Sequence, residues 1–136
     1  MQADWIEIKR GDVMPQYSGM HVSLNPKGDI VMNSITYTKL GEPVAFSVLY
    51  DRVNNRIGLK PASMSARNAY PAIKSNRTGR MVRGHRLLRE HRIILPHTVQ
   101  FDNADIDDDG ILILDLRTAI PSRRGRSHEA RRSNHE

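Results

Sequence analysis

The 136-residue chain contains no cysteine, which excludes disulfide bridges, thiolate zinc sites and cysteine nucleophiles. Aromatic residues make up 5% of it, and none is interleaved with the arginines of residues 77–92, which disfavours stacking on unpaired bases. No apolar run approaches the roughly 18 residues of a membrane-spanning helix. The N-terminus also lacks the basic start and apolar stretch of a signal peptide. We therefore expect a cytoplasmic protein without a membrane partner.

Motifs that carry catalysis are missing as well. The sequence has no phosphate-binding loop, no G-x-G-x-x-G pattern and no serine in a G-x-S-x-G context. Its six histidines show no metal-ligand spacing, since His85 and His91 fall on different faces of one predicted helix. We expect a protein that is not an enzyme and has no catalytic residues, no metal site and no cofactor.

The segment DIDDDG, residues 105–110, resembles the start of an EF-hand calcium loop. Counting from Asp105, glycine is correctly sixth, but the twelfth position holds Leu116 where the loop needs a bidentate glutamate. The following ILILDL is a strand pattern, whereas an EF-hand continues into a helix. We therefore predict an acidic hairpin turn here, with calcium binding as the alternative.

Charge is distributed unevenly along the chain. The net charge is +6, with a pI of about 10.1. Residues 61–100 hold eight Lys or Arg and one acidic residue, whereas residues 101–121 hold one Arg and six Asp. The segment 122–136 is basic again, with five arginines and two glutamates. Such clustering favours a polyanionic partner without identifying it.

Residues 20–62 are predicted to fold as a strand, a short helix and a β-hairpin. Asn33 or Ser34 is suited to cap the helix, and Gly41 to end it. Two apolar runs about an Asn-Asn turn are typical of a hairpin. The predicted elements begin with a turn at 25–28, an extended run at 29–32 and a helix at 35–40. They end with a hairpin whose strands, VAFSVLYD and IGLK, are joined by a turn at 53–56.

The same order of elements recurs in residues 80–119. The predicted parts are a strand at 80–83, a helix from His85 to about Ile94 stopped by Pro96, and a hairpin of strands 97–101 and 111–116 about the turn 102–110. A unit of this size cannot bury both faces of its hairpin alone. The two copies should therefore pack on each other or on a second chain.

These patterns predict an α+β protein that is mainly β, with two successive strand–helix–hairpin units around a small barrel-like core. The remaining segments are an N-terminal arm, a linker with a short strand near 70–73, and a disordered basic tail. Their bounds are 1–19, 63–79 and 120–136.

The stretch VSLNPKGDIVMNSITYTKLGEPVAFSVLYDRVNNRIGLKPA resembles the swapped-hairpin unit of AbrB-type regulators and MazE-type antitoxins, over residues 20–62. The chain is also similar to a group of small uncharacterised bacterial proteins. The AbrB resemblance implies an intertwined, usually dimeric β-barrel that presents basic side chains to DNA. Asp29 and Asn33 stand where the family commonly has arginine and proline, so the resemblance favours the fold more than the function. The matching positions are Lys27, Gly28, Ile30, Leu40, Gly41, Val48, Ile57, Leu59 and Pro61.

A series of arginines gives the strongest indication of a partner. Guanidinium groups match phosphate geometry, and several cations on one surface release counterions from nucleic acid. In the predicted helix, Leu87, Leu88, His91 and Ile94 or Leu95 share one face, which leaves three arginines on the solvated side. The predicted nucleic-acid-binding residues are Lys27, Arg67, Lys74, Arg77, Arg80, Arg83, Arg86, Arg89 and Arg92.

Two alternatives stay open for these charges. The arginines could instead pair with the acidic segment 102–109 or with a second subunit. The tail arginines either form a second polycation that raises affinity for any polyanion, or only solubilise the chain. They are Arg123, Arg124, Arg126, Arg131 and Arg132.

Three functions follow, in order of preference. The first is a DNA-binding transcriptional regulator of AbrB-like type that acts as a homodimer. The second is a protein-interaction module, antitoxin-like or a small structural subunit, that binds no nucleic acid. The third, an unrecognised enzyme or metal site, is supported only by the aspartate turn.

Overall fold

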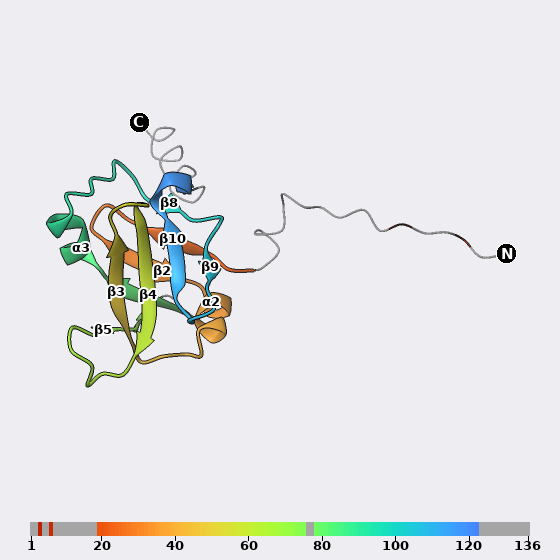
Figure 1. The fold of residues 1–136 in the computed structure, drawn as a ribbon, viewed down its shortest axis with the longest axis horizontal. Coiled ribbons are helices and arrows are strands. Elements are labelled where there is room, and N and C mark those ends of the chain that lie inside the picture. The colour runs from red at the N-terminus through yellow and green to blue at the C-terminus, as the bar shows by residue number, and fades with distance from the viewer. Residues whose placement is uncertain (1–2, 4–5, 7–18, 76–77, 123–136) are drawn as a thin grey trace, which may run out of the picture.

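The computed structural model describes residues 3, 6, 19–75 and 78–122 (Figure 1). The predicted N-terminal arm and basic tail therefore lie almost wholly outside the described residues. The first half contains β1 (Val22–Leu24), β2 (Asp29–Met32), α2 (Ser34–Lys39), β3 (Ala45–Asp51), β4 (Arg56–Ala62) and β5 (Tyr70–Pro71). The second contains β6 (Ile73–Ser75), β7 (Gly79–Arg83), α3 (His85–Glu90), β8 (Val99–Gln100), β9 (Asp105–Ile106), β10 (Leu112–Asp115), the 3₁₀ turn η2 (Leu116–Thr118) and β11 (Ile120–Pro121).

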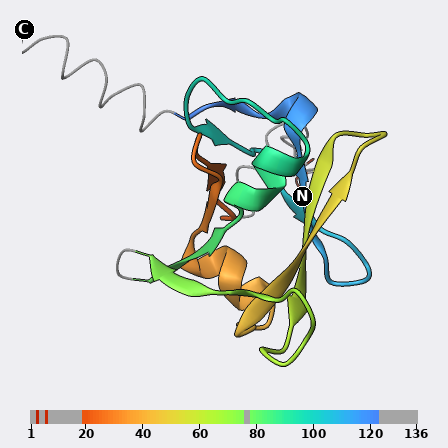
Figure 2. The same ribbon diagram turned by 90° about the vertical axis from the view of Figure 1, so that its left-hand side faces the viewer.

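The described strands form two antiparallel sheets. One has six strands in the order β11-β8-β1-β2-β7-β6, and the other has five in the order β5-β3-β4-β10-β9. Helices α2 and α3 lie between the two groups of strands in Figure 2. The prediction of a mainly β fold with two short helices is confirmed. The strands form two separate sheets, however, and not the closed barrel that the resemblance implies.

The first predicted unit forms as its sequence indicates. Asn33 caps α2, because its side-chain Oδ1 accepts a hydrogen bond from the Thr36 N–H at 3.1 Å. Gly41 follows the helix with a φ of +87°, a left-handed conformation that favours glycine. Strands β3 and β4 then pair along their full length, from Ala45 opposite Ala62 to Asp51 opposite Arg56.

The predicted hairpin of the second unit is wrong. Segment 97–101 contributes β8, which pairs with β1 and β11 in the six-stranded sheet. Strand β10 belongs to the other sheet and pairs with β4 and with β9, which arises inside the predicted turn. The turn is shorter than expected because the Asp107 carboxylate accepts hydrogen bonds from the N–H groups of Asp109 and Ile111, both at 2.9 Å.

Helix α3 is also shorter than predicted. It ends at Glu90, and the N–H of Ile93 donates to the Leu88 carbonyl at 2.9 Å, as in a Schellman motif. Arg92 takes the left-handed position of that motif, with a φ of +52°. The sequence does not reveal this end because the position usually holds glycine. As a result Ile94, predicted on the buried face, is 88% exposed.

The predicted linker 63–79 also contributes structure. It supplies β5, which pairs with the start of β3, and β6, which forms a hairpin with β7. The sequence predicts only a single short strand near residues 70–73, because Ala72, which separates β5 from β6, is not a typical turn residue.

The two halves pack on each other within one chain. Strand β2 pairs with β7, with Ile30 opposite Val82, and β4 pairs with β10, with Leu59 opposite Leu112. All four of these side chains are fully buried. One hydrophobic core therefore draws on both halves, as burial of both hairpin faces requires.

A close backbone contact joins the halves at Gly28. Its φ is +99°, and its carbonyl accepts a hydrogen bond from the Gly84 N–H at 2.8 Å. A Cβ atom at residue 28 would lie 2.4 Å from the Cα of His85. The turn of the first half thus touches the start of α3 with no room for a side chain.

We expect Gly28→Ala to lower the free energy of unfolding by about 2–4 kcal/mol, because it combines an unfavourable φ with a backbone clash. Gly41→Ala is the matched control, since Gly41 also has a positive φ but nothing lies within 4 Å of the added Cβ. The control should cost only about 1 kcal/mol. Urea unfolding measures the free energy of unfolding of both variants. An equal loss of stability in the two variants would contradict the tight contact at Gly28.

The β3–β4 turn is held by the carboxylate of Asp51. It accepts hydrogen bonds from the side chains of Asn54 at 2.8 Å and Arg56 at 2.9 Å. These hydrogen bonds, that of Asn54 first, lower the pKa of Asp51 from 3.8 to about 2. Because the folded pKa lies below the unfolded one, the charged carboxylate stabilises the fold above pH 4, and this stabilisation is lost as the pH falls toward 2.

Asp51→Asn should therefore lower the thermal midpoint at pH 7, and the difference from the wild type should shrink between pH 4 and pH 2. Melting curves followed by circular dichroism across this range test the prediction. A constant difference over the whole range would show that the charge of Asp51 does not stabilise the turn.

Candidate nucleic-acid interface

A groove of about 920 Å³ lies between β3, the loop that joins β4 to β5, and α3. Its residues come from three segments that are distant in the sequence. Three of the predicted nucleic-acid-binding arginines line it. The lining residues are Ser47, Val48, Leu49, Arg67, Asn68, Ala69, Tyr70, His85, Arg86, Arg89 and Glu90.

The groove exists because β5 is short. It pairs only with Ala45 and Phe46, so on this side of β3, opposite β4, no described strand continues from Ser47 onward. The preceding loop turns twice, through hydrogen bonds from Ala66 to Ser63 and from Ala69 to Ala66. Asn68 adopts a left-handed φ of +62°, which asparagine tolerates better than most residues.

Helix α3 forms the basic wall of the groove. Leu87 and Leu88 are buried in the core. His85, Arg86, Arg89 and Glu90 are therefore exposed, as predicted for these two arginines. The third predicted arginine, Arg92, lies beyond the end of the helix, and His91, predicted on the buried face, is exposed. Arg86 and Arg89 are three positions apart and so lie on the same side of the helix.

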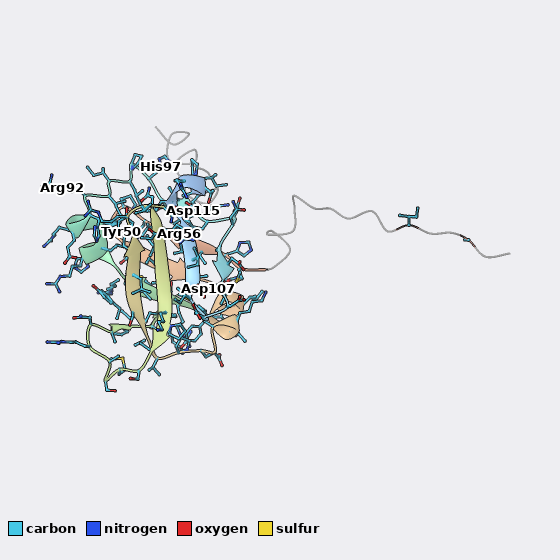
Figure 3. All side chains as sticks on the ribbon, viewed as in Figure 1. Tyr50, Arg56, Arg92, His97, Asp107 and Asp115 are labelled. Atoms are coloured by element: carbon cyan, nitrogen blue, oxygen red, sulfur yellow. The ribbon has the colours of Figure 1, made fainter. Side chains whose placement is uncertain are left out.

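Among the described residues, the positive charge of the groove is only partly neutralised. Arg86 pairs with Glu90 at 3.5 Å, but both side chains are more than 60% exposed, and such pairs contribute little. Within the described residues, no ion pair joins an arginine of 67–92 to the acidic segment 102–109. Figure 3 shows Asp107 separated from α3 by the strands of the five-stranded sheet.

Two further predicted residues lie near the start of α3. Lys27 is exposed and precedes Gly28, which contacts His85. Arg83 is exposed and precedes Gly84. Asp29 stands directly across the ladder from Arg83, but its carboxylate accepts a hydrogen bond from the Asn25 amide at 3.1 Å and belongs to the turn.

The other predicted residues are placed differently. Arg80 lies over the Tyr37 ring, 4.6 Å from its centroid, and donates to the carbonyls of Thr78 and Gly79. Lys74 is exposed on the edge strand β6. Arg92 points outward beyond the end of α3 (Figure 3). Arg77 and the five tail arginines lie outside the described residues.

A second hollow, of about 510 Å³, lies over β1, β2 and β8 and has different chemistry. Its ionisable lining residues are His21 and Asp102, and Asp102 accepts a hydrogen bond from Gln100 at 2.8 Å. Its described lining includes no lysine or arginine. The sequence analysis did not predict this hollow.

Other site types find little support in the described part of the chain. The acidic segment does form a turn, but a shorter one than predicted, between β9 and β10. Within the described residues, no group of three or more His, Cys, Asp or Glu side chains is placed to hold a metal ion. Among the described helices, none has the length and apolarity to cross a membrane.

Comparison with protein-family models, with curated proteins and with solved structures gave no match to this chain.

The placement of Arg80 separates it from the groove arginines. Arg80→Gln should lower the free energy of unfolding by about 1 kcal/mol, because it removes the cation–π contact with Tyr37. The side chain of Arg89 is exposed, so Arg89→Gln should change the free energy of unfolding by less than about 0.5 kcal/mol. Urea unfolding of the two variants, which lose the same charge, provides the comparison. Equal stabilities would mean that the contact contributes nothing.

Proposed function

We propose that this protein binds nucleic acid, DNA in the first instance, through the groove beside α3 and catalyses no reaction. The observation that carries the proposal is the convergence of Arg67, Arg86 and Arg89 on one hollow with a single acidic residue, Glu90. Lys27 and Arg83, near the start of the helix, are also exposed, although they do not line the groove.

Phosphate is the ligand that suits this arrangement. Guanidinium groups pair with phosphate oxygens through two parallel hydrogen bonds. Arg67 and Arg89 make no side-chain hydrogen bond or ion pair within the described residues, so binding need not break contacts of the fold. Each phosphate contact also releases counterions, which favours association at low salt.

We further propose that the fold is an AbrB-like swapped hairpin in single-chain form, and that the protein acts as a transcriptional regulator. The pairing of β2 with β7 and of β4 with β10 supports the fold, because each half completes the sheet of the other. Since one chain supplies both halves, the core does not require the predicted homodimer, which stays a prediction.

A second candidate function is protein binding. It is favoured by the edge of β3 beyond Phe46, which has no strand partner in the described part of the chain. An extended acidic peptide added to this edge would place its side chains near the arginines of the groove.

The proposal predicts salt-dependent binding that depends on the groove. Fluorescence anisotropy with a labelled DNA duplex should show affinity that falls steeply between 50 and 200 mM salt. Arg86→Ala with Arg89→Ala should reduce the slope of log affinity against log salt by about 2, because each phosphate contact contributes about 0.9.

Lys60→Ala with Arg117→Ala is the matched control, because it removes two positive charges that do not line the groove. Its slope should stay near that of the wild type. Equal effects of the two double variants would contradict a localised interface. No binding of either duplex or single-stranded DNA at 50 mM salt would overturn the proposal and favour the protein-binding alternative.

A further inference from the structure

The groove is lined by polar and apolar residues as well as by arginines. These residues bear on whether single-stranded or duplex nucleic acid suits the groove. Tyr70, Asn68 and Ser47 lie among its arginines, together with Val48 and Leu49. We propose that the groove holds an unpaired nucleotide, so that the protein binds single-stranded nucleic acid in preference to duplex. This inference rests on the proposed function and specifies its ligand.

The apolar part of the groove suits the face of a base. Tyr70 is half-buried and packs against the hydrophobic core, which fixes its position. Leu49, a residue that is 42% exposed, also lines the groove. Aromatic and aliphatic surface of this kind is where an unstacked base is bound in single-strand complexes, and it contributes nothing to contact with phosphate.

The polar part of the groove suits the edge of a base. Within the described residues, the side chains of Ser47, Asn68 and Tyr70 make no hydrogen bond to the rest of the protein. The Asn68 amide offers both a donor and an acceptor, the combination that base edges need. Arg67 is its neighbour in the same loop, so a phosphate and its base would be held by adjacent residues.

The shape of the basic surface disfavours duplex. A recognition helix must project into the major groove of DNA. Here α3 has only six residues, about 9 Å at 1.5 Å per residue, and its basic side is a wall of a hollow. In a duplex the faces of the bases are covered by stacking and cannot reach Tyr70 or Leu49.

The sequence alone predicts no binding of unpaired bases. It disfavoured stacking because no aromatic residue is interleaved with arginines 77–92. The fold places Tyr70, at the start of β5, in the same groove as Arg86 and Arg89, an arrangement that sequence spacing does not show.

The test compares a labelled 12-nucleotide mixed-sequence strand with the same strand annealed to its complement, at equal salt. The wild type should bind the single strand at least tenfold more tightly. Tyr70→Ala should weaken single-strand binding by about fivefold to a hundredfold, as loss of one stacked base does. Tyr70→Phe should retain the stacking contribution, and both variants should bind duplex like the wild type.

Asn68→Gly is a second variant that keeps the left-handed backbone and removes the amide. It should weaken single-strand binding severalfold even if Tyr70→Ala does not fold. Photocrosslinking of a 5-iodouracil-substituted strand, followed by mass spectrometry, should place the crosslink at Tyr70.

The outcomes separate this inference from the proposed function. Tighter binding of duplex, or single-strand binding unaffected by Tyr70→Ala and Asn68→Gly, would overturn the inference while leaving nucleic-acid binding in place. Absence of binding to both probes at 50 mM salt would overturn both.

Discussion

The structure depends on pairing between strands of its two halves. Strand β2 pairs with β7 and β4 pairs with β10, so neither half has a complete sheet without the other. The contact between Gly28 and the start of α3 fixes the halves at close range, because backbone meets backbone without a side chain between them. The shared core follows from this constraint, since Ile30, Leu59, Val82 and Leu112, which come from the strands of these two ladders, are all fully buried.

The groove is a consequence of the same arrangement. Packing of Leu87 and Leu88 into the shared core turns the charged side of α3 outward, and the early end of β5 leaves the space that this side faces. The arginines are therefore held by elements whose positions are set by burial of apolar side chains. Their charges take little part in folding, which leaves them available to a ligand.

Much of the first half could be predicted because its signals are local. The Asn33 cap, the glycine after α2 and the Asn-Asn turn each act within a few residues. The second half was harder, because Arg92 ends α3 where glycine is usual and because Asp107 closes a tight turn inside a longer polar segment. The solvated arginine face of α3 was predictable from helical spacing. The position of this face beside Arg67 and Tyr70 in one groove could not be predicted, because it depends on tertiary packing.

Containing both halves in one chain has a consequence for symmetry. An assembly of two identical chains carries every surface twice, related by a two-fold axis, and so suits palindromic targets. In this protein the second half contains α3 with its two arginines. The corresponding helix of the first half, α2, has Lys39 as its only lysine or arginine. The described part of the molecule therefore presents one such groove. If the proposed function is correct, a single nucleic-acid strand bound in this groove would have a defined 5′-to-3′ direction.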